Sequence, residues 1–387
     1  MWSGRRPLRF VVDGARADRR AMSGPAWAGR LGAASAAIIL LLLVTGVPAR
    51  ADGWRERQWY FAPMKLAQAQ RLANGGAGVT VAVLDTGIDG RHQDLRGAVV
   101  AGRYTPRDEP AGNTTSGPHG TAMATLIAGR GHGDGDGLLG VAPRSKVMPI
   151  RPVMDHTLVV EGIEWAIQRG AKVINMSFEL DSDGTLEKAV AKAAAADVVL
   201  VAAAGNENSG VSAPARYPGV IAVGSVGRDN KVAGFSNHGP ELDVVAYGMG
   251  IPVARPGNSY AVTNGTSVSS AIVAGAVALV RARYPDMSAA EVVDRILDTA
   301  IDRGPAGRDD RYGAGQLDVL AALTAKRTAE TASPAPARVT DVPVGAPAAA
   351  ASTSDGRLPP LLIVAVGSLM LIVALVLLVM LRVRRNS

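Results

Sequence analysis

Three short segments bring an aspartate, a histidine and a serine, in that order, next to small residues. They are Asp85-Thr86-Gly87, His119-Gly120-Thr121 and Gly265-Thr266-Ser267. A serine hydroxyl is a poor nucleophile until a neighbouring base takes its proton, and an acidic group orients that base. Together the segments predict acyl-transfer chemistry, with Ser267 as the nucleophile, His119 as the base and Asp85 holding the imidazole. Each residue alone could be a helix cap or a turn residue, but that interpretation leaves their joint occurrence unexplained.

The elements around these residues are predicted to place them at one edge of a sheet. Residues 79–84 are apolar and β-branched, which is typical of a buried parallel strand that delivers Asp85 to its carboxyl end. A helix is expected over 120–129, directly after His119, and another over 268–283, opened by Ser267. Further strands are predicted at 146–151, 172–177, 197–203 and 220–226, and further helices at 158–169, 185–195 and 288–300, the last with a Ser288–Glu291 capping box. This alternation predicts an α/β fold with a mostly parallel central sheet covered on both faces.

Asn206 is a candidate for the same site. It follows the predicted strand 197–203, where parallel strands place their functional residues. Acyl transfer needs hydrogen-bond donors aimed at the developing oxyanion, and a side-chain amide can be one of them, paired with the backbone N–H of Ser267. The alternative is an ordinary Gly-Asn turn after a strand.

Seven motifs in this order resemble the subtilase family over roughly residues 60–325. They are Asp85-Thr86-Gly87, His119-Gly120-Thr121, Leu139-Gly140-Val141-Ala142-Pro143, Val173-Ile174-Asn175-Met176-Ser177, Ala204-Gly205-Asn206, Tyr217-Pro218-Gly219-Val220-Ile221-Ala222-Val223-Gly224 and Gly265-Thr266-Ser267. The resemblance implies a subtilisin-like three-layer fold and a serine endopeptidase. It also implies that the segment at Ser177 pairs with the substrate backbone. Ala203, Ala204 and Gly205 would wall the pocket for the residue before the scissile bond.

The sequence departs from the family pattern at three places. Phe178-Glu179-Leu180 stands where many subtilases have Gly-Gly, so we expect an altered pocket to which Glu179 adds acidity. Ala271 and Tyr247 each replace a common proline. None of these changes removes a catalytic group, although they are compatible with weak activity.

No cofactor or catalytic metal is predicted, and a structural calcium ion is possible without being predicted. The glycine-rich segment 131–137 offers two carboxylates, Asp134 and Asp136, and Asp94 is a further candidate ligand. Calcium prefers six or more oxygen ligands, and His132 in this segment is not a calcium ligand. A mobile glycine loop beside the active site is therefore the favoured interpretation.

The N-terminal part is predicted to be an extension with a signal peptide, residues 1–51. Residues 33–47 are an apolar run, preceded by Arg30 and followed by an Ala-x-Ala cleavage motif at 49–51. Translation from Met22 instead of Met1 would give an ordinary signal peptide. Residues 52–78 leave room only for a short arm, with an aromatic stretch over 54–61 and a helix over 63–72, which we expect to pack on the peptidase domain, 79–325.

The C-terminal part is predicted to anchor the chain in a membrane. A Pro- and Ala-rich linker covers 326–359, and its few large apolar residues predict no fold. The transmembrane helix is placed at 360–381, where residues 361–381 are apolar or small without a charge, long enough for a bilayer core of ~30 Å. Three arginines follow in the tail 382–387, so the positive-inside rule places the tail in the cytoplasm and the peptidase domain outside. A buried C-terminal helix is the alternative.

The net charge of +7 comes from the predicted signal-peptide region and the C-terminal tail, so it does not indicate a binding surface for an acidic partner. Residues 1–51 hold eight arginines and two aspartates and the tail holds three arginines, so the remainder carries about −2. No basic patch therefore argues for nucleic acid. The chain has no cysteine, and a peptidase domain of this size can build a large core without disulfides.

The short arm, the Pro- and Ala-rich linker and the single transmembrane helix resemble those of the mycosins, which are membrane-anchored subtilases of actinobacterial type VII secretion systems. This resemblance implies a protein or peptide substrate, a cell-membrane location and a possible secretion complex as partner. Two alternatives stay open: a general cell-surface subtilase unrelated to secretion, and a scaffold subunit that stabilises a secretion complex with weak protease activity. A lipase or esterase is disfavoured because no G-x-S-x-G elbow surrounds Ser267.

Overall fold

The computed structural model describes residues 52–104, 115–152 and 155–326. All of them belong to one unit of the chain, Met1–Lys326. The predicted signal peptide, nearly all of the linker, the transmembrane helix and the tail lie outside the described residues.

A seven-stranded parallel sheet forms the centre of this unit, in the order β2-β5-β1-β6-β7-β8-β9. Its strands are β1 (Thr80–Leu84), β2 (Arg103–Tyr104), β5 (Lys146–Arg151), β6 (Val173–Met176), β7 (Val199–Ala203), β8 (Val220–Val226) and β9 (Val244–Tyr247). The strands from β6 to β9 are buried along their whole length, which explains why they are nearly continuous runs of valine, isoleucine and alanine.

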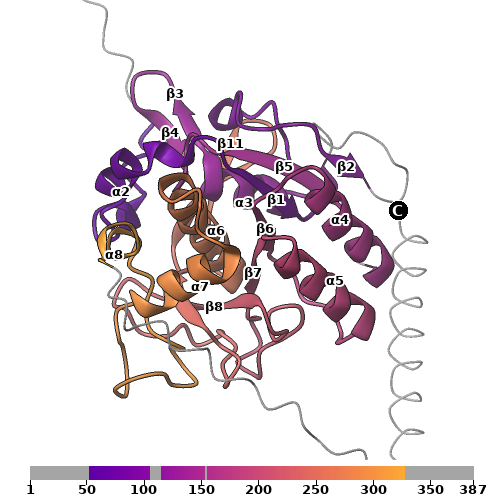
Figure 1. The fold of residues 1–387 in the computed structure, drawn as a ribbon. Helices are drawn as coiled ribbons and strands as arrows, with labels where there is room; N and C mark the ends of the chain where they lie inside the picture. The colour runs from indigo at the N-terminus through magenta and orange to yellow at the C-terminus, as the bar shows by residue number, and fades with distance from the viewer. Residues whose placement is uncertain (1–51, 105–114, 153–154, 327–387) are drawn as a thin grey trace, which may run out of the picture. The chain divides into compact units, whose positions relative to one another are not determined.

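Helices cover both faces of the sheet (Figure 1). On one face lie α4 (His156–Gln168) and α5 (Gly184–Ala195), and on the other lie α3 (His119–Ala128) and α6 (Thr266–Arg283). α6 itself carries small side chains on all its sides, which let it contact the strands from β6 to β9 closely. Within the part of the chain that is described, α6 is the one helix long and apolar enough to cross a membrane, and 83% of it is buried inside the protein. We therefore interpret it as the core helix of this fold.

The remaining elements surround this framework. They are α2 (Leu66–Leu72), β3 (Arg130–His132), β4 (Asp136–Leu139), β10 (Ile251–Arg255), β11 (Ser259–Thr263), α7 (Ala289–Asp298), α8 (Val319–Thr324) and the 3-10 turns Trp59–Phe61, Asn74–Gly76 and Gln93–Leu95. β3 pairs with β4 and β10 with β11, each as an antiparallel hairpin. α7 begins with the predicted capping box, in which Ser288 and Glu291 bond each other's backbone.

The predicted three-layer α/β fold is confirmed, and each predicted strand or helix of the sheet framework is present. The prediction of a mobile glycine loop at 131–137 is wrong, because this segment forms the β3–β4 hairpin. Asp94, which is fully buried, holds the hairpin: its Oδ1 lies 2.6 Å from His132 Nδ1, and its Oδ2 accepts from the Leu138 N–H at 2.8 Å. Asp94 is the one candidate calcium ligand inside the protein, and its two oxygens already contact His132 and the Leu138 N–H. These residues therefore do not fit a calcium site.

The N-terminal arm packs on the peptidase domain, as expected from its aromatic residues. The Trp59 ring contacts Tyr247 of β9 edge-on, with 4.8 Å between the ring centroids, and its Nε1–H donates to the Gly250 carbonyl at 3.0 Å. The Trp54 ring stacks on Tyr260 of β11 at 5.0 Å. Tyr247, which stands where the resemblance implies a proline, is therefore one of the contact points of the arm.

Candidate active site

Asp85 and His119 meet at the carboxyl end of β1. The Asp85 backbone N–H continues the strand ladder to Ile150, and the side chain is only 3% exposed. His119 is the first residue of α3, and its Nδ1 lies 2.8 Å from Asp85 Oδ2 and 2.9 Å from Oδ1. Burial lowers the pKa of His119, but the hydrogen bond and the charge of Asp85 outweigh it, so the pKa lies above its ordinary value of 6.5.

The turn after Asp85 fixes the distance between β1 and α3. Gly87 has φ +88°, a conformation that favours glycine. A Cβ atom on Gly120 would lie 2.3 Å from the Gly87 carbonyl oxygen, so only glycine allows this approach. The Thr86 hydroxyl accepts from the Gly120 N–H at 3.0 Å and donates to the Gly117 carbonyl at 3.1 Å. These contacts explain why small residues flank both polar side chains in the sequence.

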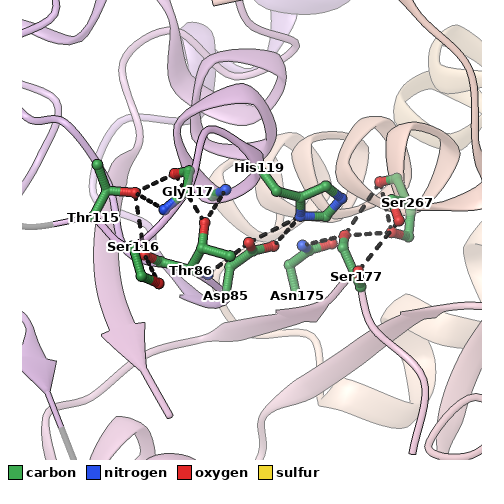
Figure 2. A network of polar contacts seen from close by, with 11 residues as sticks. Asp85, Thr86, Thr115, Ser116, Gly117, His119, Asn175, Ser177 and Ser267 are labelled. Carbon is green, nitrogen blue, oxygen red and sulfur yellow. Dashed lines mark hydrogen bonds and ion pairs between the residues drawn. The ribbon is translucent and has the colours of Figure 1, made fainter. Parts of the chain in front are cut away.

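Ser267 lies in the first turn of α6, and the imidazole of His119 lies between it and Asp85 (Figure 2). Its hydroxyl donates to the Ser177 carbonyl at 3.2 Å. No hydrogen bond joins Ser267 to His119 in this geometry. Hydrogen bonds between a nucleophile and its base are often long without substrate and tighten in the complex.

Asn206 is held by the start of α6. Its Oδ1 accepts from the Thr266 backbone N–H at 2.9 Å and from the Thr266 hydroxyl at 3.2 Å. Because the carbonyl oxygen of the amide is engaged in this way, the Nδ2 donors are left for a ligand. The N–H groups in the first turn of a helix have no intrahelical partner, so the Ser267 N–H is a second donor beside them.

Ser177 is buried rather than open to the cleft, with 5% of its surface exposed. Its hydroxyl accepts from Asn175 Nδ2 at 2.8 Å and lies 2.9 Å from Ser270 Oγ. It also lies within 3.2 Å of the Ser267 carbonyl. The Ser177 side chain therefore ties β6 to α6, and only its backbone faces the Ser267 hydroxyl.

The predicted pocket wall, Ala203, Ala204 and Gly205, is buried at the end of β7. A Cβ atom on Gly205 would lie 2.8 Å from Glu179 Oε2, so the Glu179 carboxyl group lies directly against this wall. Burial raises the pKa of Glu179, and the neighbouring carboxyl group of Glu207 raises it further.

Glu207 was not predicted as a site residue, because it follows the Gly-Asn motif and belongs to no sequence pattern of its own. Its Oε2 accepts from the Asn206 N–H at 2.8 Å and from Asn237 Nδ2 at 3.2 Å. The fully buried Asn237 in turn accepts from the Glu207 N–H at 2.9 Å. The acidity expected from Glu179 thus comes from two carboxyl groups.

A cleft of about 470 Å³ opens beside Ser267, His119 and Asn206. Its other walls come from the start of α3, the first turn of α6 and the β10–β11 hairpin. The hairpin was not predicted either, because neither of its strands alternates between buried and exposed residues: β10 is buried except at Arg255, and β11 is exposed or half-buried. Among the described residues, no group of three or more His, Cys, Asp or Glu side chains could hold a metal ion.

Comparisons with known proteins agree with this geometry. The subtilase family model matches residues 76–315. The chain is 40% identical to subtilisin DY of Bacillus licheniformis over 270 residues, which cover 67% of this chain and 96% of that protein. It is also 40% identical to a subtilisin of Bacillus pumilus over 64% of this chain and 91% of that protein.

A solved structure extends this similarity to the fold. The crystal structure of MycP1 with its N-terminal propeptide removed superimposes with a TM-score of 0.63 at 29% identity. The match covers 70% of this chain and 97% of that one. The chain therefore belongs to the subtilase family and is a subtilisin-like serine endopeptidase.

Proposed function

We propose that Asp85, His119 and Ser267 are the catalytic triad of this endopeptidase. The observation that carries the proposal is the pair of short contacts from His119 Nδ1 to Asp85, with the imidazole lying between Asp85 and Ser267 (Figure 2). This arrangement leaves the second ring nitrogen, Nε2, for the serine proton.

In the proposed mechanism, Ser267 Oγ attacks the carbonyl carbon of the scissile bond while His119 takes its proton. The negative charge on the carbonyl oxygen is stabilised by Asn206 Nδ2 and the Ser267 N–H. His119 then gives the proton to the leaving amine, and the acyl group stays on Ser267. Water, activated by the same imidazole, hydrolyses this ester and restores the hydroxyl. Asp85 stabilises the imidazolium in both steps.

A fluorophosphonate probe tests this assignment, since it reacts with an activated serine. Ser267→Ala should abolish labelling and reduce kcat by about 10⁶-fold, as in subtilisin, a member of the same family. Circular dichroism and the melting temperature should stay unchanged, because Ser267 is half-buried and its hydroxyl makes a single hydrogen bond. Unchanged labelling of the variant would assign the nucleophile to another residue.

We further propose that the peptidase domain lies outside the cytoplasmic membrane and is anchored by residues 361–381. The uninterrupted apolar run and the arginines after it support this topology. Protease added to intact spheroplasts should cut the linker first and release a fragment of peptidase-domain size, while a C-terminal tag stays undigested. Digestion of the tag with protection of the domain would reverse the orientation.

Association with a type VII secretion complex is proposed on the resemblance to mycosins and the structural similarity to MycP1. The chain and its Ser267→Ala variant should be purified from membranes in mild detergent. Recovery of the same membrane complex with both would favour a scaffold role alongside proteolysis. Recovery of the peptidase alone would favour a general surface subtilase.

A further inference from the structure

The β10–β11 hairpin forms one wall of the cleft beside Ser267. It contributes Val253, Arg255, Ala261, Val262 and Thr263. Val262 is 54% exposed, so its apolar side chain is open to solvent. Arg255 carries the only fixed charge among the described lining residues. The hairpin thus offers a ligand an apolar surface with one guanidinium group.

Arg255 has no acidic partner among the described residues. It is exposed, and none of the ion pairs of the described part includes it. Asp89 reaches the same hairpin, but its oxygens accept backbone N–H groups of Arg91 at 3.1 Å and Gly257 at 3.0 Å. A guanidinium group in this position suits a carboxylate ligand, which it can bind through two parallel hydrogen bonds.

The proposed mechanism indicates which part of a substrate meets this wall. His119 protonates the leaving amine, so the residues after the scissile bond lie on its side of the cleft. The same cleft runs from His119 and Pro118, at the start of α3, to the hairpin. An extended peptide advances about 3.3 Å per residue, or about 10 Å over three residues.

We propose that Arg255 selects substrates with an aspartate or glutamate within the first three residues after the scissile bond. The residue directly after that bond would be apolar, because Met123, Val262 and Val268 line the cleft around Ser267. This inference rests on the proposed function, since it uses Ser267 as the nucleophile and His119 as the acid.

Acyl transfer tests the inference directly. A small ester substrate forms the acyl-enzyme. Water and an added peptide amine then compete for the acyl group, and the peptide can react only when it binds where the residues after the scissile bond lie. Tripeptide amides with glutamate or glutamine at each position are compared as acceptors. We expect glutamate to be captured about 1.5-fold to fivefold better at one position, the range for an exposed ion pair, and the ratio to fall with added salt.

Variants of the same residue assign the preference. Arg255→Ala should bring the ratio close to one, Arg255→Lys should keep part of it, and Arg255→Glu should favour lysine acceptors instead. Arg96→Ala is the matched control, because it removes an equally exposed arginine outside the cleft and should keep the ratio. Melting temperatures should be the same for all four variants, since neither side chain is buried.

Two outcomes separate the inference from the proposed function. Equal capture of glutamate and glutamine by an enzyme that hydrolyses the ester would overturn the role of Arg255 alone. So would a preference that survives Arg255→Ala. An enzyme that neither hydrolyses the ester nor reacts with a fluorophosphonate would overturn the proposed function and this inference with it.

Discussion

Asn206→Ala separates transition-state stabilisation from substrate binding. The two bonds from Thr266 hold the amide oxygen, at 2.9 Å and 3.2 Å, so the Nδ2 donors are fixed before substrate arrives. Removing one fixed donor at the oxyanion costs about 10²–10³ in kcat, a magnitude known from subtilisin itself. KM should change little, because the charge on the carbonyl oxygen develops only in the transition state.

The structure also sets the expected effect of this change on stability. Asn206 is exposed, and the Thr266 hydroxyl keeps its contacts with Gly205 at 3.2 Å. The remaining loss is about one neutral hydrogen bond, or about 1 kcal/mol. For a domain of this size this lowers the melting temperature by about 2–4 °C. Activity at 25 °C therefore reports on chemistry and not on unfolding.

The assay is steady-state hydrolysis of a chromogenic peptide, combined with thermal unfolding. Asn206→Asp is the matched variant, because it keeps an oxygen acceptor for Thr266 but removes the donor and adds a negative charge near the oxyanion. We expect it to lose at least as much kcat as Asn206→Ala. A loss confined to KM, or an aspartate variant within threefold of the wild-type kcat, would refute the reasoning.

Three further predictions follow from the packing around the site and the arm. Asp85→Asn should lower kcat by about 10⁴-fold. It should also shift the acidic limb of the kcat/KM profile to lower pH, because the pKa of His119 falls without the Asp85 carboxylate and the imidazole stays neutral at lower pH. An acidic limb at the same pH as in the wild type would contradict this. Gly120→Ala should cost about 1–3 kcal/mol by thermal unfolding, since its Cβ would lie 2.3 Å from the Gly87 oxygen; a neutral change would refute the close approach. Trp59→Ala should cost about 2 kcal/mol with kcat unchanged, and an unaltered melting temperature would mean that the arm is not docked in solution.

Local sequence patterns were enough to predict the sheet framework and the polar residues at the ends of its strands. An apolar, β-branched run that ends in Asp85 predicts a buried parallel strand with a polar residue at its carboxyl end. The start of a helix could also be predicted, as at Ser288, because capping residues and periodicity are local properties of the sequence. The family motifs then assigned roles to Asp85, His119, Ser267 and Asn206, which stay predictions until the variants are measured.

The contacts between distant segments could not be predicted from local patterns. The Trp59 side chain bonds a carbonyl 191 residues away, and the Glu179 carboxyl group meets Gly205 from the neighbouring strand. The sequence predicted that the arm packs on the domain and that Glu179 adds acidity to the pocket, but it did not identify the partner of either side chain, because each contact depends on how two elements with independent local patterns pack together. The same holds for Arg255, because the hairpin and Ser267 line the same cleft only after the chain has folded. Local chemistry thus predicted which elements exist, and long-range packing decided what surrounds the serine.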